Sequence, residues 1–196
     1  MKVELIMSTE EKLIGECAKI CYASKSIEDG GRDITSSLVH KSKHLSVLRF
    51  AYASFHIEGI SVACQNQLVR SKHLDFLVES KRYVDPEKGG FEFIMPKVDE
   101  TAQQLINNHW DNALELYKYL IGRGVKKEDA RAVLPMNTST KVNVSGNLQS
   151  YMDFLRLRLS SKAQKEIRDL ANEIYLHLSV KFPQVFTKEI YLEFSK

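Results

Sequence analysis

The chain has 196 residues, 43% hydrophobic and 27% charged, with a formal net charge of +3 at pH 7. No stretch approaches the roughly 20 apolar residues that a membrane-spanning helix needs, and the small positive charge does not indicate a nucleic-acid-binding protein. A net charge of this size is compatible with a ligand that bears phosphate, but it is equally compatible with no particular partner. The length suits one hydrophobic core, so residues 1–196 are predicted to form a single domain.

The first 22 residues predict a strand and then a helix. Residues 1–7 form a short apolar run that contains an acidic residue and no small-residue cleavage site, which indicates a strand rather than a signal peptide. We therefore expect a cytoplasmic protein. Residues 8–22 begin with Ser-Thr-Glu-Glu, a helix-start pattern. The predicted apolar stripe of this helix consists of Leu13, Cys17, Ile20 and Cys21.

The three cysteines argue against a disulfide framework, because an odd number cannot be fully paired. Cys17, Cys21 and Cys64 all lie among apolar helical positions, and we predict that they are buried core thiols. The spacing of Cys17 and Cys21 could also suit a metal ion. No second pair of ligands accompanies them, so a metal site is not predicted.

The next segments alternate between loops and regular elements. Residues 26–33, with two adjacent glycines, predict a loop, and a short helix is expected to end near Leu38. Residues 50–58 alternate between apolar and polar side chains, as a half-buried strand does, and Gly59 is expected to end that strand. Ser61 can cap a helix over residues 62–70. Residues 71–83 are polar and predict an irregular segment.

The second half predicts mostly helices. Residues 91–94 are a short strand candidate, and residues 99–121 predict a long amphipathic helix that Gly122 and Gly124 end. Its expected inward residues are Leu105, Ile106, Trp110, Leu114, Tyr117 and Ile121. The remaining predicted elements are a short helix near Asp129, a strand at 142–144, a helix at 148–159 and a last long helix through Ile167, Leu170, Ala171, Ile174 and Leu178. These elements predict an α+β class, helix-rich around a small, mainly antiparallel sheet.

Common enzyme signatures are absent from the sequence. There is no glycine-rich dinucleotide fingerprint, no phosphate-binding glycine-lysine loop and no cluster with convincing metal-ligand spacing. The densest polar stretch runs from Gln67 to Tyr83, where cationic residues follow a short helix. A polar run of this kind is usually a solvated surface, so it does not by itself indicate a site.

One arginine stands on an apolar helix stripe. In the helix after Asn147, the stripe of Tyr151, Phe154 and Leu155 continues to Arg158, which is therefore expected to point inward. An inward guanidinium needs a carboxylate, a phosphate or the edge of a base, because an unpaired buried charge is costly. An internal salt bridge or an arginine that reaches out to solvent is the simpler alternative from this helix alone.

Several segments resemble the flavin-dependent thymidylate synthases. The signature of that family reads Arg-His-Arg, seven residues, then Ser, and here Arg70-Ser71-Lys72 is followed after seven residues by Ser80 and then by Lys81-Arg82-Tyr83. Other segments match in the family's order. They are residues 44–48, 57–61, 67–70, 131–135 and 147–158.

The resemblance implies a homotetramer whose active sites lie between subunits, each holding FAD against dUMP. It implies dUMP binding by Gln67, Arg70, Ser80, Lys81, Arg82, Arg131 and Arg158, and FAD binding by His44, Ser46, Arg70, Ser71, Lys72, Asn147, Gln149 and Asp153. Arg158 matches the catalytic arginine that binds the uracil edge and stabilises its ionised form. NADPH would reduce the flavin and 5,10-methylenetetrahydrofolate would supply the carbon.

The chain departs from the family pattern at four positions. Ser71 replaces the central histidine of the motif, Lys72 replaces its second arginine, and Val78 and Arg49 stand where the family has glutamates. Lysine keeps the charge of arginine but loses its planar pair of donors. Three outcomes stay open: methylation of dUMP, the same scaffold acting on another pyrimidine or making a hydroxymethyl product, and a catalytically silent nucleotide-binding homologue.

Overall fold

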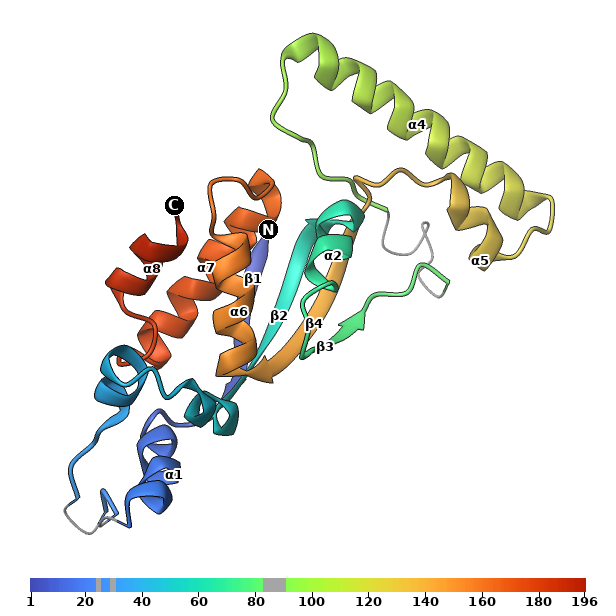
Figure 1. Ribbon diagram of the computed structural model, residues 1–196. Helices are drawn as coiled ribbons and strands as arrows, with labels where there is room; N and C mark the ends of the chain where they lie inside the picture. Colours follow the sequence, from blue (N-terminus) through green and yellow to red (C-terminus); the bar gives the residue numbers. More distant parts are fainter. Residues whose placement is uncertain (24–25, 29–30, 83–90) are drawn as a thin grey trace.

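The computed structural model describes residues 1–23, 26–28, 31–82 and 91–196. It contains a four-stranded sheet in the order β1-β2-β4-β3, and each neighbouring pair is antiparallel. The strands are β1 (Lys2–Ser8), β2 (Tyr52–Ser61), β3 (Leu74–Val78) and β4 (Ser139–Asn147). The predicted helix-rich α+β class with a small antiparallel sheet is therefore confirmed (Figure 1).

One face of the sheet carries the main hydrophobic core. Ala53, Phe55 and Ile57 of β2 have no exposed surface, as the alternation of residues 50–58 predicts. The helices that contribute buried residues to this core include α2 (Val62–Leu68), α6 (Leu148–Arg158) and α7 (Lys165–Lys181). Tyr151 of α6 donates its hydroxyl to the carbonyls of Ala53 and Val144, at 3.2 and 3.3 Å, which ties this helix to the sheet.

Two strand predictions are wrong. Gly59 does not end β2, which continues to Ser61. Gly59 has a φ of 71° and lies where the register with β4 shifts, so it forms an irregularity of the β-bulge type inside the strand rather than its end. Residues 71–83 are not irregular throughout, because residues 74–78 form β3 along the edge of β4. The apolar Leu77 is exposed, so the sequence of this short edge strand does not alternate between apolar and polar residues. Tyr83 lies outside the described residues.

The first helix, α1 (Lys12–Tyr22), ends where predicted but begins only at Lys12, because Ser8 still belongs to β1, and it buries a different face. Ile14 and Ala18 have no exposed surface, whereas Ile20 is 84% exposed. The expected stripe of Leu13, Cys17, Ile20 and Cys21 is therefore wrong, because the helix is turned by about one residue so that Ile14 and Ala18 meet the core.

The exposure of the three cysteines also differs from the prediction. Only Cys64 is buried, while Cys17 is half-buried and Cys21 is exposed, so the expectation of three core thiols is wrong.

The connections around the core are short helices. The helix expected to end near Leu38 instead continues as the π-helical turn η1 (Ser37–Lys41), which the 3₁₀ turn η2 (Leu45–Phe50) follows. A last helix, α8 (Lys188–Phe194), was not predicted. Among the described residues, no helix combines the length and the apolar character needed to cross a membrane.

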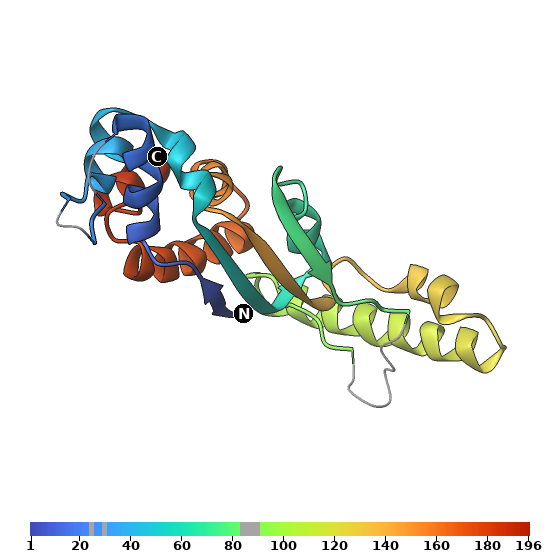
Figure 2. The ribbon, with the colours of Figure 1, turned by 90° about the horizontal axis from the view of Figure 1, so that it is seen from below.

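A second, smaller hydrophobic cluster lies in an arm formed by α4 (Glu100–Gly122), α5 (Lys127–Ala130) and η3 (Arg131–Val133). Figure 2 shows this arm extending from the end of the sheet that is opposite α1 and α8. Its buried residues are Phe91, Trp110, Tyr117 and Ala130. The long helix predicted at 99–121 is confirmed as α4, and Asp99 caps it by accepting a hydrogen bond from the Ala102 amide at 2.8 Å.

Two details of the arm differ from the sequence-based expectation. Leu105 is 65% exposed, so its inward assignment is wrong, because the face of α4 that packs inside the arm is the one with Trp110, Leu114 and Tyr117. The strand expected at 91–94 is reduced to one bridge, between Phe93 and Thr138.

Two helical glycines provide a matched test of packing. A Cβ on Gly15 would lie 2.8 Å from Asp33 Oδ1 and 3.0 Å from Thr35 Oγ1, and Gln184 and the Thr35 amide hold that carboxylate in place. Gly15→Ala is expected to destabilise the fold by about 1–3 kcal/mol despite alanine's better helix propensity. Urea denaturation measures the change.

Gly122→Ala is the control, because nothing lies within 4 Å of the added Cβ. It is expected to be neutral or to stabilise by up to about 1 kcal/mol. If the two variants were equally stable, close packing of α1 against the loop around Asp33 would be refuted.

Candidate functional site

The site residues expected from the sequence lie in three groups. The first lines a cavity between the start of β4, the segment after β3 and η3. The second surrounds Arg158 at the end of α6. The third lies where β4 ends and α6 begins. Each group brings together segments that are distant in the sequence.

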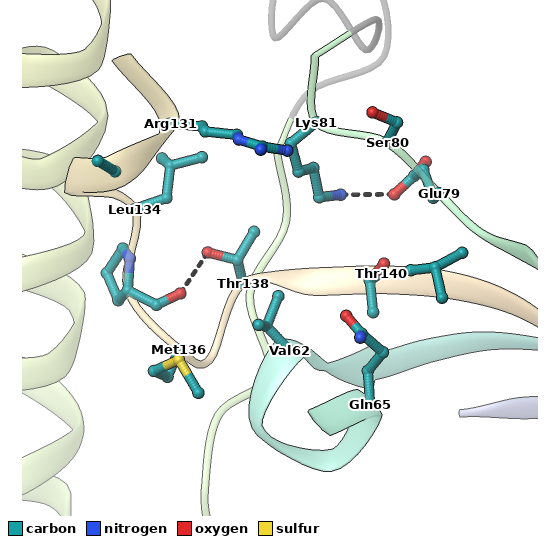
Figure 3. A pocket seen from close by; sticks show the side chains of 13 residues that line it. Val62, Gln65, Glu79, Ser80, Lys81, Arg131, Leu134, Met136, Thr138 and Thr140 are labelled. Atoms are coloured by element: carbon teal, nitrogen blue, oxygen red, sulfur yellow. Dashed lines mark hydrogen bonds and ion pairs between the residues drawn. The ribbon is translucent and has the colours of Figure 1, made fainter. Parts of the chain in front are cut away.

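The cavity has a volume of about 480 Å³, within the range of small-molecule sites. Figure 3 shows Ser80 and Lys81 entering from the segment after β3, while Arg131 enters from η3 on the opposite wall. Thr138 and Thr140 belong to the start of β4. The other lining residues are Val62, Gln65, Val78, Glu79, Ala132, Leu134, Pro135 and Met136.

Two carboxylates hold cations at or near this cavity. Lys81 Nζ lies 2.5 Å from Glu79 Oε2, and the two side chains are only 13% and 23% exposed. Arg82 Nη2 lies 2.5 Å from Glu128 Oε2, and Arg131 Nε donates to the Glu128 carbonyl at 3.1 Å. Glu128 therefore connects two arginines from different segments.

Arg158 is half-buried and points toward α2, as its place on the apolar stripe predicts. Its Nη2 donates to the Gln67 carbonyl at 2.9 Å. Its Nε is buried and has no hydrogen-bond partner among the described residues. None of the ion pairs in the described part of the chain involves Arg158, so the alternative of an internal salt bridge finds no support there.

The surroundings of Arg158 disfavour its positive charge. Burial and the nearby charge of Arg70 both lower the pKa of the Arg158 guanidinium. The side chain of Gln67, which also belongs to this group, donates to Gln164 Oε1. An anion or an electron-rich ligand edge placed between the two arginines would relieve their repulsion.

The third group gathers most of the residues expected to bind flavin. Asn147 caps α6 by accepting from the Ser150 amide at 3.0 Å, and Gln149 Nε2 donates to Asp153 Oδ1 at 3.2 Å. Gln149 Oε1 is buried without a hydrogen-bond partner among the described residues. The Leu148 amide donates to Ala51, which joins α6 to the end of η2.

The turn with the altered motif lies at the same end of the sheet. Leu74 pairs with Gly146, so residues 71–73 come close to the start of α6. A Cβ at Gly146 would collide with the Leu74 side chain, which explains the glycine. Ser71 Oγ is buried with no partner in the part of the chain that is described, whereas Lys72 is exposed. His44 and Ser46 lie at the start of η2.

The three groups do not merge within one chain. The five residues of β3 separate Arg70, Ser71 and Lys72 from Ser80 and the residues that follow, at about 3.3 Å per residue. Arg158 does not line the cavity, although α2 contributes Gln65 to the cavity wall and the Gln67 carbonyl to Arg158.

Sequence reasoning missed Glu79 and Glu128. Glu79 and Lys81 are two residues apart in an extended segment, where such positions share a face, so that pairing was detectable from the sequence. The pairing of Glu128 with Arg82 spans 46 positions and had no such signal.

Metal and thiol chemistry find no support in this geometry. No group of three or more potential metal-ligating side chains occurs within the described residues. Burial, assisted by the charge of Glu166, raises the pKa of Cys64 to about 12, so its thiol is protonated and inert at neutral pH.

Three comparisons with known proteins agree. The family model described as "Thymidylate synthase complementing protein" matches residues 4–184. The flavin-dependent thymidylate synthase of Geobacter sulfurreducens is 34% identical over 198 residues, which cover 95% of this chain and 85% of the relative. That of Clostridium tetani is 29% identical over 215 residues, with the same coverage.

A solved structure is also similar. The crystal structure of Thymidylate Synthase X (ThyX) from Helicobacter pylori with FAD and dUMP gives a TM-score of 0.81 at 24% identity, covering 97% of this chain and 99% of the other. This similarity establishes the fold.

The cysteines yield a prediction about reactivity. Iodoacetamide at about pH 8 is expected to modify the exposed Cys21 in the folded protein and to leave Cys64 unmodified, because only the thiolate reacts and burial keeps Cys64 protonated. Peptide mass spectrometry measures the modification at each site. Unfolding in urea should abolish the difference, and rapid labelling of Cys64 in the native state would contradict its burial.

Proposed function

Because the chain belongs to the thymidylate synthase complementing protein family, that of the flavin-dependent thymidylate synthases, we propose that it methylates dUMP to dTMP. The carbon donor is 5,10-methylenetetrahydrofolate, and NADPH is the reductant. The observation that carries this proposal is Arg158, a half-buried arginine that lies beside another cation and has a buried nitrogen without a partner among the described residues.

Arg158 suits the edge of a pyrimidine. The uracil edge presents carbonyl oxygens, and it gains negative charge when the ring ionises. A planar guanidinium can donate to such an edge at fixed geometry, and a partly dry site strengthens this attraction. Since Arg70 lies close enough to disfavour the charge of Arg158, both cations gain from a ligand that becomes anionic.

The cavity suits the phosphate end of the nucleotide. Ser80 offers a hydroxyl, while Lys81 and Arg131 offer positive charge from opposite walls. Arg82 is anchored beside them through Glu128. Gln67 of α2 and Arg70 of the turn that follows it lie beside Arg158, and α2 also contributes Gln65 to the cavity wall. We assign these residues to dUMP on that basis.

The third group fits FAD. Ser71 Oγ and Gln149 Oε1 are buried polar atoms without partners among the described residues, and Arg70 and Lys72 lie on the same turn as Ser71, where a diphosphate needs cations. His44, Ser46, Asn147 and Asp153 complete the proposed set. When bound, FAD supplies the hydride that completes the methyl group, and the chain's own residues hold and orient it.

We propose that the active enzyme is a homotetramer with sites between subunits. The separation of the three groups within one chain supports this arrangement, because residues from a second copy could complete each site. Native mass spectrometry gives both the subunit count and the bound flavin. A monomer that binds dUMP and flavin fully would refute the assembly but leave the reaction untouched.

Product analysis tests the reaction. The protein is incubated with FAD, NADPH, methylenetetrahydrofolate and dUMP, and the nucleotides are separated by liquid chromatography with mass detection. We expect dTMP. A hydroxymethyl product, or turnover of dCMP in place of dUMP, would redirect the assignment to another one-carbon reaction. Flavin and nucleotide binding without any product would identify a silent homologue.

Arg158→Lys tests the role of the guanidinium. The substitution keeps the charge but removes the planar donors, so dUMP binding is expected to weaken by about tenfold, equivalent to about 1.4 kcal/mol, and turnover to fall. Bound flavin should remain. Calorimetric titration with dUMP, the flavin absorption band and the melting temperature are measured on one preparation.

Arg168→Lys is the matched control. Arg168 Nη1 also donates to a backbone carbonyl at 2.9 Å, that of Ser161, but Arg168 belongs to none of the three groups. It should leave dUMP affinity unchanged. If Arg158→Lys lowered the melting temperature and left the affinity intact, Arg158 would be structural, and Arg131 and Arg82 would be the better substrate ligands.

A further inference from the structure

A carboxylate lies inside the cavity that we assign to the phosphate of the ligand. Glu79 Oε2 is 2.5 Å from Lys81 Nζ, and this ion pair is mostly shielded from water. Figure 3 shows both side chains on the cavity wall beside Ser80. A negative charge at this place is unexpected, because a phosphate that enters the cavity carries the same sign.

Both partners of the ion pair are held in place. The Glu79 amide donates to the Lys141 carbonyl at 2.9 Å, so its backbone extends the pairing of β3 with β4. Lys81 Nζ lies 5.4 Å from the centre of the Phe91 ring, an arrangement that attracts a cation. Phe91 itself is 7% exposed and packs against Tyr117 in the core of the arm.

The carboxylate takes a donor that a phosphate would otherwise use. An ammonium has three donors in all, and here one is directed at Glu79 while the ring lies beside another side of the group. Among the described residues that line the cavity, the charged side chains are one anion, Glu79, and two cations, Lys81 and Arg131. Without the anion, both cations would act on the ligand.

We propose that Glu79 is an anion gate: its carboxylate competes with the ligand phosphate for Lys81 and thereby sets how strongly the cavity prefers phosphorylated over unphosphorylated ligands. The choice of dUMP as the ligand rests on the proposed function. The competition itself concerns any phosphate group. Glu79 acts through Lys81, so it is a residue that tunes specificity rather than a catalytic residue.

Glu79→Gln tests the gate. Glutamine has the shape of glutamate and can still accept a hydrogen bond from Lys81, but it carries no charge. We expect the variant to bind dUMP about tenfold more tightly than the wild type, because charge pairs in a shielded site are strong. Affinity for deoxyuridine, which lacks the phosphate, should stay unchanged. Calorimetric titration of both ligands measures this difference.

Two further variants complete the test. Glu10→Gln removes the same charge from an exposed pair with Lys181, at 3.0 Å, and should leave dUMP affinity unchanged. Lys81→Met removes the cation and should weaken binding of dUMP but not of deoxyuridine. Melting temperatures confirm that each variant is folded.

The outcomes separate the gate from the proposed function. Unchanged or weaker dUMP binding by Glu79→Gln, or equal gains for dUMP and deoxyuridine, would overturn the gate. If the wild type bound no dUMP, the proposed function would fail. Titration with inorganic phosphate would then test separately whether Glu79 competes with a phosphate for Lys81. Tighter phosphate binding by Glu79→Gln than by the wild type and Glu10→Gln would support it, and equal binding would refute it.

Discussion

The pairing of β4 along both of its edges fixes the geometry of the whole site. β2 and β3 hold this strand from either side, so its two ends cannot move independently. Its first residues form one wall of the cavity, and its last residue, Asn147, caps the helix that carries Arg158. Nine residues of extended chain span about 26 Å, which keeps the cavity and the third group apart. Within one chain these two groups therefore remain separate.

The cavity and the surroundings of Arg158 also differ in how their positive charges are balanced. At the cavity, Lys81 and Arg82 are each paired with a carboxylate, so their charge is partly neutralised before any ligand arrives. Arg158 instead lies near Arg70, and both burial and the charge of Arg70 lower the pKa of the Arg158 guanidinium. Because of this contrast, the cavity can tune affinity for a phosphate, whereas Arg158 is suited to a group that gains negative charge during the reaction.

The altered motif, Arg70-Ser71-Lys72, lies in the turn between α2 and β3. Ser71 is half-buried in the turn before β3, and its Oγ atom is buried without a partner among the described residues, while Lys72 is exposed. The close approach of this turn to Gly146 ties it to the start of α6. Ser71 and Lys72 thus change the proposed flavin side of the site, whereas Val78, which stands where the family has a glutamate, lines the cavity. Arg158 itself matches the family.

The sequence by itself determined the elements whose periodicity is unambiguous: the alternating strand β2, the long amphipathic helix α4, and the stripe of α6 that directs Arg158 inward. The resemblance to the family also predicted site residues that lie in the three groups, although it missed Glu79 and Glu128. Only the tertiary structure decided which face of α1 is buried, that residues 74–78 form a strand, and that Glu128 meets Arg82. The physical reason is that periodicity fixes the spacing of side chains along one element, whereas burial and ion pairing depend on which other segments pack against it.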